Sequence, residues 1–80
     1  MQIVDLDETV RGAVVRLLDV PPERLTVQTP LLDIGLDDDT GLDVLLEVED
    51  ALDVRFPDDF LEGLRTYGDL TSAVRRAVGG

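Results

Sequence analysis

The residues with the greatest potential for chemistry are three consecutive aspartates, Asp37, Asp38 and Asp39, which precede an apolar pattern typical of a helix. Carboxylates grouped in this way can hold a divalent cation, as the acidic loop of a calcium-binding helix pair does. Aligning Gly41 with the glycine of such a loop places Leu36 at the first ligand position, where an acid is required. We therefore expect no specific metal site, only loose association of Mg²⁺ or Ca²⁺, and we interpret the acids as caps of a helix.

The chain lacks the side chains on which most enzymatic mechanisms depend. It contains no histidine, cysteine or lysine, and its single serine, Ser72, has no base close to it in the sequence. Paired carboxylates can support acid–base chemistry, but they need burial or coupling, and here they fall at positions expected to face outward. We predict that the protein is not an enzyme. The absence of cysteine also excludes disulfides and zinc–thiolate sites.

Four amphipathic segments are expected to position these acids. The first covers about 8–19 and the central one about 38–52, while a short third segment opens at Pro57 and the last follows Thr66. Apolar residues recur in them at spacings of three and four, which is typical of one buried helical face. The expected fold is all-α, a single domain over 1–80 that forms a four-helix bundle with a short third helix.

The connection between the first two helices is expected to be a long loop, because 26–36 contains Pro30 and Gly35 and few helix formers. Its apolar residues indicate that it packs over the helices. The residues expected on the core faces of the three longer helices are Val10, Ala13, Val14, Leu17, Leu18, Val44, Leu45, Val48, Leu52, Leu70, Ala73, Val74, Ala77 and Val78.

The net charge of −11 is concentrated in one part of the chain. The segment 33–62 holds twelve acids and one arginine, Arg55, whereas the remaining residues hold six of each sign. Such a field repels nucleic acid and anionic lipid and attracts basic protein surfaces. No apolar run approaches the roughly 20 residues of a membrane span, and nothing near Met1 resembles a secretory signal. We expect a cytoplasmic monomer with neither nucleic-acid nor membrane partners.

The outer face of the central helix carries a second pattern. Asp43, Glu47 and Asp50 recur at i, i+4 and i+7, and Leu42 and Leu46 lie beside them. Because the core face uses other residues, we predict that both leucines are partly exposed. Acids that flank two leucines suit a partner whose surface is basic around an apolar centre. The alternative interpretation is an ordinary solvated helix face with isolated leucines.

This region resembles the centre of the acyl carrier proteins. In that family, Asp-Leu-Gly-x-Asp-Ser-Leu precedes a long acidic helix, which is followed by an apolar residue and Pro-Asp. Here 33–37 matches the first part, and Glu49, Asp50, Leu52 and 56–58 match the rest without a gap. The resemblance continues into the connections before the second and last helices, and so covers nearly the whole chain.

The resemblance implies a carrier function, but the chain differs at the residue that performs it. The family carries acyl chains as thioesters on a phosphopantetheine arm that is attached to the Ser of the motif. That Ser falls on Asp38, and the Leu after it falls on Asp39. Because a carboxylate offers no hydroxyl, we expect no phosphopantetheine on the chain as sequenced. A deliberate Ser→Asp change would have kept the Leu, so Asp39 favours natural divergence of the whole site.

The resemblance also implies that the central helix docks biosynthetic enzymes, because several of its residues fall on positions that the family uses for docking. We therefore predict a protein-docking surface on and beside this helix. Its predicted residues are Asp37, Leu42, Asp43, Leu46, Glu47, Glu49 and Asp50.

Three interpretations of function follow. The first is a carrier-like, non-catalytic protein of a fatty-acid or polyketide-type pathway, which lacks the attachment Ser and acts by docking to a synthase, transferase or tailoring enzyme. The second is a genuine acyl carrier protein whose attachment Ser has been replaced by Asp38 in the sample. The third is a small acidic adaptor unrelated to acyl chemistry.

Overall fold

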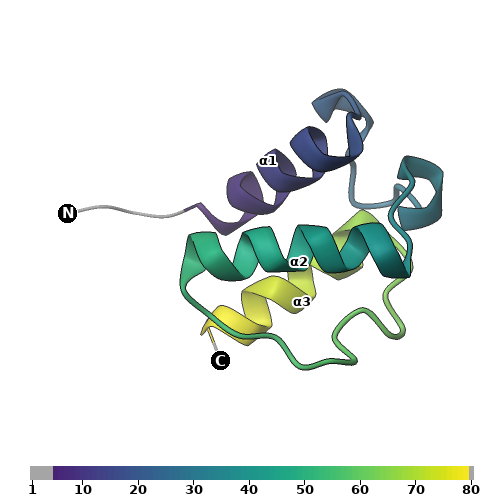
Figure 1. The fold of residues 1–80 in the computed structure, drawn as a ribbon. Coiled ribbons are helices and arrows are strands. Elements are labelled where there is room, and N and C mark those ends of the chain that lie inside the picture. Colours follow the sequence, from purple (N-terminus) through teal and green to yellow (C-terminus); the bar gives the residue numbers. More distant parts are fainter. Residues whose placement is uncertain (1–4, 80) are drawn as a thin grey trace.

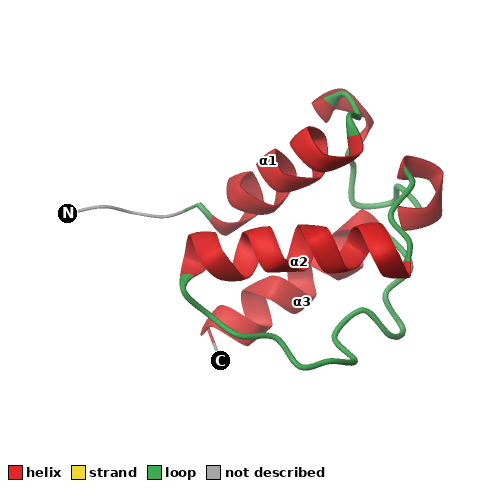
Figure 2. Ribbon diagram, viewed as in Figure 1, coloured by secondary structure: helices red, strands yellow, loops and turns green. Residues whose placement is uncertain are grey.

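The computed structural model of the protein describes residues 5–79, and within them the fold is built from helices and turns (Figure 1). α1 lies along α2 and also contacts α3. Figure 2 shows no strand in the described residues, so the predicted all-α class is confirmed. None of these helices is long and apolar enough to cross a lipid bilayer. The elements are α1 (Leu6–Leu18), the 3₁₀ helices η1 (Pro22–Arg24) and η2 (Leu31–Ile34), α2 (Asp38–Leu52) and α3 (Tyr67–Gly79).

The limits of α1 follow from its caps. The amide of Glu8 donates to the carboxylate of Asp5 at 3.3 Å, which satisfies one of the free N–H groups of the first turn. At the other end Asp19 adopts a left-handed conformation with φ 55°, which ends the helix. The prediction that Leu17 lies in the core is wrong. Leu17 is in the last turn, borders an open groove and is 43% exposed.

The start of α3 is also fixed by a cap. The amide of Asp69 donates to the Thr66 hydroxyl at 3.1 Å, and the amide of Thr66 donates back to the Asp69 carboxylate at 3.2 Å. Backbone N–H groups, that of Arg65 first, lower the pKa of Asp69. The predictions that Ala77 and Val78 are buried are wrong, because the end of α3 extends beyond the core.

The short helix predicted to open at Pro57 is absent from residues 5–79, and Figure 2 draws this segment as a loop. The described residues form three α-helices instead of the predicted four. The segment forms successive turns instead. The amides of Phe60, Glu62 and Leu64 each donate to the carbonyl three residues earlier, at 3.0 to 3.2 Å. Pro57 has no amide to donate, and Gly63 adopts φ 82°. The stretch between them is too short to support a helix by itself.

The connection between α1 and α2 packs over the helices, as predicted. It is fastened by backbone hydrogen bonds to the entry of α3. The amide of Tyr67 donates to the Thr29 carbonyl at 2.8 Å, and that of Gly68 donates to the Val27 carbonyl at 3.0 Å. A Cβ on Gly68 would lie 2.7 Å from that carbonyl oxygen, so the crossing requires glycine. The loop therefore has a fixed path into the first turn of α2.

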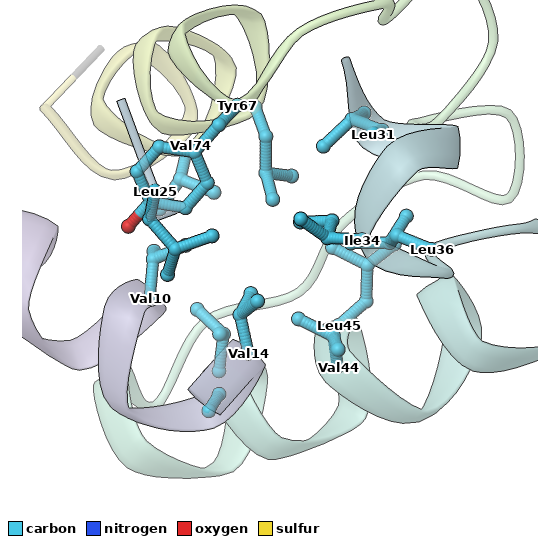
Figure 3. Close-up of a cluster of buried hydrophobic side chains, with 13 residues drawn as sticks. Val10, Val14, Leu25, Leu31, Ile34, Leu36, Val44, Leu45, Tyr67 and Val74 are labelled. Carbon is cyan, nitrogen blue, oxygen red and sulfur yellow. The ribbon is translucent and has the colours of Figure 1, made fainter. Parts of the chain in front are cut away.

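The core draws residues from all three helices and from the long connection (Figure 3). Tyr67 places its ring in this cluster, and burial raises the pKa of its phenol. Among the residues of the central helix, Leu52 is only partly buried. The buried apolar residues are Val10, Ala13, Val14, Leu25, Leu31, Ile34, Leu36, Val44, Leu45, Val48, Tyr67, Leu70 and Val74.

Candidate functional site

The start of α2 is fixed by a reciprocal cap. The carboxylate of Asp37 accepts the amides of Asp39 and Thr40, both at 2.9 Å. In return, the Thr40 hydroxyl accepts the amide of Asp37 at 2.8 Å. The Thr40 N–H and then its hydroxyl lower the pKa of Asp37, because both stabilise the charged carboxylate. Asp37, which we predicted as a docking residue, is therefore engaged in holding the helix.

Asp38, which we predicted to stand where the family has its Ser, is the first residue of α2 and is exposed. Within 5–79 its carboxylate makes no hydrogen bond and no ion pair. Gly35, with φ 83°, turns the chain out of η2 just before this point. The chain thus turns sharply at Gly35 before it enters α2, and the carboxylate of Asp38 lies exposed to solvent at the start of the helix.

The nearest hydroxyl along the chain is that of Thr40, and it is already engaged. It donates to the Gly35 carbonyl at 2.7 Å while it accepts the amide of Asp37. Thr40 is also only partly exposed. To act as a nucleophile, this hydroxyl would have to leave the cap of α2. The first turn therefore holds no free hydroxyl.

Two concavities meet at Asp38. The first, which we call the acidic groove, has a volume of about 1230 Å³ and lies between the exposed face of α2 and the connection that follows it. Eight carboxylates and one arginine, Arg55, line it together with apolar side chains. Because carboxylates outnumber the one cation, the groove suits a positively charged occupant.

The second concavity, the apolar pocket, has a volume of about 520 Å³ and adjoins η2 and the segment before α3. Leu61 and Asp38 line both concavities. A Cβ on Gly41 would lie 2.6 Å from the side chain of Leu61, so glycine lets Leu61 approach the first turn of α2. The apolar residues that line this pocket are Pro30, Leu31, Leu32, Leu36, Leu61 and Leu64.

The leucines of the exposed face of α2 lie as predicted. Leu42 and Leu46 are 56% and 54% exposed, and both line the acidic groove. Asp43 and Asp50 are exposed beside them. The acids and leucines of the predicted docking surface thus share one side of the helix.

Glu47 and Glu49 differ from the other predicted docking residues because each has a partner within the protein. Glu47 forms an ion pair with Arg16 of α1. Glu49 is only partly exposed and accepts the amide of Phe56 at 2.6 Å. The sequence did not reveal these contacts because each joins residues from different elements. For Arg16 it indicated only a position outside the core face of α1.

The acids do not form a metal centre. Across the part of the chain that the structure describes, no three potential ligand side chains converge on one point. Asp37, Asp38 and Asp39 are consecutive, but the carboxylate of Asp37 is directed to the amides of the first turn, where it caps the helix.

Comparison with known proteins connects this geometry to a family. The family model described as "Phosphopantetheine attachment site" matches residues 8–74. The acyl carrier protein of Phenylobacterium zucineum (strain HLK1) is 30% identical to this chain over 94% of the chain and 96% of its own length. The acyl carrier protein of Caulobacter vibrioides (strain NA1000 / CB15N) is 33% identical over 81% of this chain and 85% of its own length. The match of the family model covers α2, the long connection before it, most of α1 and the first part of α3.

Proposed function

The chain belongs to the acyl carrier protein family, and from this premise we propose that it is a carrier-like protein that acts by docking without a covalent arm. The family consists of carriers, so the protein is not an enzyme. We assign it as a single-domain, monomeric, cytoplasmic partner of an enzyme in a fatty-acid or polyketide-type pathway. That enzyme would be a synthase, a transferase or a tailoring enzyme with a basic docking surface.

The observation that carries this proposal is the free carboxylate of Asp38 at the start of α2. The residues present do not fit the attached phosphopantetheine that the family implies, because attachment needs a free hydroxyl at this point. An ionised carboxylate only accepts hydrogen bonds, and its attack on a phosphate would give a labile acyl phosphate instead of a stable ester. The Thr40 hydroxyl does not replace it because the cap of α2 holds it.

Docking remains available to a protein without the arm. The exposed side of α2 combines Leu42 and Leu46 with Asp43 and Asp50, two exposed acids that form no ion pair within residues 5–79. Exposed acids mainly raise the association rate of a basic partner, whereas an apolar side chain that becomes buried slows dissociation. The acids of this surface can therefore speed association, and its leucines can slow dissociation.

The docking proposal predicts separate effects on the two rate constants. A partner is captured from the native cell with the parent protein, identified and then tested against variants. We expect Leu46→Ala to speed dissociation, and Asp43→Lys with Asp50→Lys to slow association and to flatten its salt dependence. Leu32→Ala is the matched control, because Leu32 is 78% exposed and lies outside the acidic groove. Unchanged kinetics in all variants would contradict docking through α2.

The second candidate is a genuine acyl carrier protein whose attachment Ser has been replaced by Asp38 in the sample. The apolar pocket that adjoins Asp38 favours it, because such a pocket has room for part of an attached chain. In that case Asp38→Ser, which restores the hydroxyl, should allow phosphopantetheine to be attached at position 38. The third interpretation, an adaptor unrelated to this family, required the resemblance to be accidental. The family match shows that it is not accidental, so this interpretation is wrong.

A further inference from the structure

Two residues of α1, Arg16 and Leu17, reach the surface on which we propose docking. Leu17 is 43% exposed and lines the acidic groove, as Leu46 of α2 does. Arg16 pairs with Glu47 of α2. α1 and α2 lie side by side (Figure 1), so both helices border the groove.

The pair of Arg16 and Glu47 is exposed and can exchange partners. The exposed fractions of the two side chains are 64% for Arg16 and 38% for Glu47. Solvent and salt weaken ion pairs of this kind, so a cation from another molecule can replace Arg16 at little cost. Until that happens, Arg16 neutralises one carboxylate beside the groove.

From these contacts, and resting on the proposed function, we infer that the docking surface extends from α2 onto α1. Leu17 is its second apolar anchor, and Arg16 is an internal counter-ion that a cation of the partner displaces from Glu47. The partner segment that fits is a basic amphipathic helix whose apolar face covers Leu17 and Leu46. The partner helix is expected to be basic because eight carboxylates and one arginine, Arg55, line the groove that it would occupy.

A synthetic peptide of known sequence supplies the probe. It is a helix of roughly 18 residues, five turns, with leucines along one face and arginines beside them. A peptide of the same composition in scrambled order, without the apolar face, is its control. The full-length protein, labelled with ¹⁵N, is titrated with each peptide, and the amide shifts and the dissociation constant are measured at two salt concentrations.

We expect the amphipathic peptide to bind more tightly than the scrambled one and to shift the amides of Arg16 and Leu17 together with that of Leu46. Leu17→Ala should weaken binding about fivefold, because it removes part of the apolar area that the helix covers. Arg16→Ala should strengthen binding about twofold, because Glu47 is then free for the peptide. Leu32→Ala should leave the dissociation constant unchanged.

The outcomes separate this inference from the proposal on which it rests. If Leu46→Ala weakens binding while Leu17→Ala does not, docking through α2 stands and the extension onto α1 is wrong. Equal binding of the two peptides to the parent protein would contradict both. Weaker binding of Arg16→Ala would contradict the counter-ion role. Circular dichroism of each variant confirms that it is folded, and the amide shifts of the parent protein test the surface without any substitution.

Discussion

Three residues at the start of α2, Asp37, Asp38 and Thr40, have different roles in the site. Asp37 turns its carboxylate inward to the amides of the first turn, and Thr40 returns a hydroxyl to the backbone of Asp37. Between them Asp38 has no partner in the described residues and faces solvent. The chemistry that position 38 offers therefore depends on the residue type there, because the cap fixes the backbone around it.

The cap makes a prediction about pH. The hydrogen bonds of Asp37 lower its pKa in the folded protein below the ordinary value of 3.8. Its contribution to stability is then fully present above that value, and it is lost as the pH falls through the lowered pKa. Asp37→Ala should lower the free energy of unfolding at pH 7, and the difference from the parent protein should shrink as the pH falls below 3.8.

Urea unfolding at a series of pH values measures this difference. Asp39→Ala is the matched control, since it removes the same charge from the same turn without removing the cap. The cap account would be contradicted if the two variants lost equal stability at pH 7, or if the loss in Asp37→Ala did not depend on pH.

At the scale of elements, Glu49 joins α2 to the turns that follow it. Its carboxylate accepts the amide of Phe56 at 2.6 Å, and the ring of Phe56 stacks on that of Phe60 with centroids 4.4 Å apart. Asp53, with φ 56°, ends the helix between these contacts. The Glu49 carboxylate thus fastens one wall of the acidic groove to α2 through a charged hydrogen bond.

Removing the hydrogen bond between the Glu49 carboxylate and the Phe56 amide should increase the mobility of the connection that follows α2. We expect Glu49→Ala to destabilise the protein by about 1–2 kcal/mol, since the Phe56 amide loses a charged acceptor. Glu49→Gln should cost less, because its side-chain carbonyl still accepts. Asp50→Ala controls for the loss of charge, and hydrogen exchange of the Phe56 amide reports the contact directly. Equal exchange rates in Glu49→Ala and Asp50→Ala would show that Glu49 does not hold the connection.

Local signals in the sequence were sufficient for much of the fold. The run of aspartates before the apolar pattern and the spacing of Val44, Leu45 and Val48 predicted a central helix over about 38–52, which matches α2. The last helix was expected after Thr66, where α3 begins. The helix expected after Pro57 was wrong, because apolar spacing alone does not distinguish a helical turn from a series of turns.

The sequence was less informative about contacts between elements. The exposure of Leu42 and Leu46 was predicted from the core face of the same helix, and the structure confirms it. The partners of Glu47 and Glu49 belong to other elements, so no spacing within α2 could reveal them. Leu17 was misplaced because helical periodicity does not show where a neighbouring element ends.

At the scale of the molecule, the dominant feature is the concentration of negative charge. Twelve acids and one arginine occupy 33–62. In the described residues two ion pairs join side chains, Arg16 with Glu47 and Arg75 with Asp7, and only the first engages the acidic segment. Most of these carboxylates therefore repel one another in the folded protein.

This repulsion predicts a response to salt. Salt screens exposed charges beyond about 10 Å at 0.1 M, so the melting temperature should rise with added NaCl. Millimolar Mg²⁺ should raise it further by loose association. A variant with Asp58→Asn and Asp59→Asn should start at a higher melting temperature and respond less. A melting temperature that stays flat in both titrations would contradict the repulsion.

The central claim is that a protein of the acyl carrier fold works here without a covalent arm, and intact mass measures it most directly. The parent protein, Asp38→Ser, and Asp38→Ser with Asp39→Leu are incubated with coenzyme A and a broad-specificity phosphopantetheinyl transferase. We predict that the parent mass stays unchanged, that the single variant is modified poorly and that the double variant gains one phosphopantetheinyl group. A parent protein that gains this group, on Thr40 or on any other residue, would contradict the account.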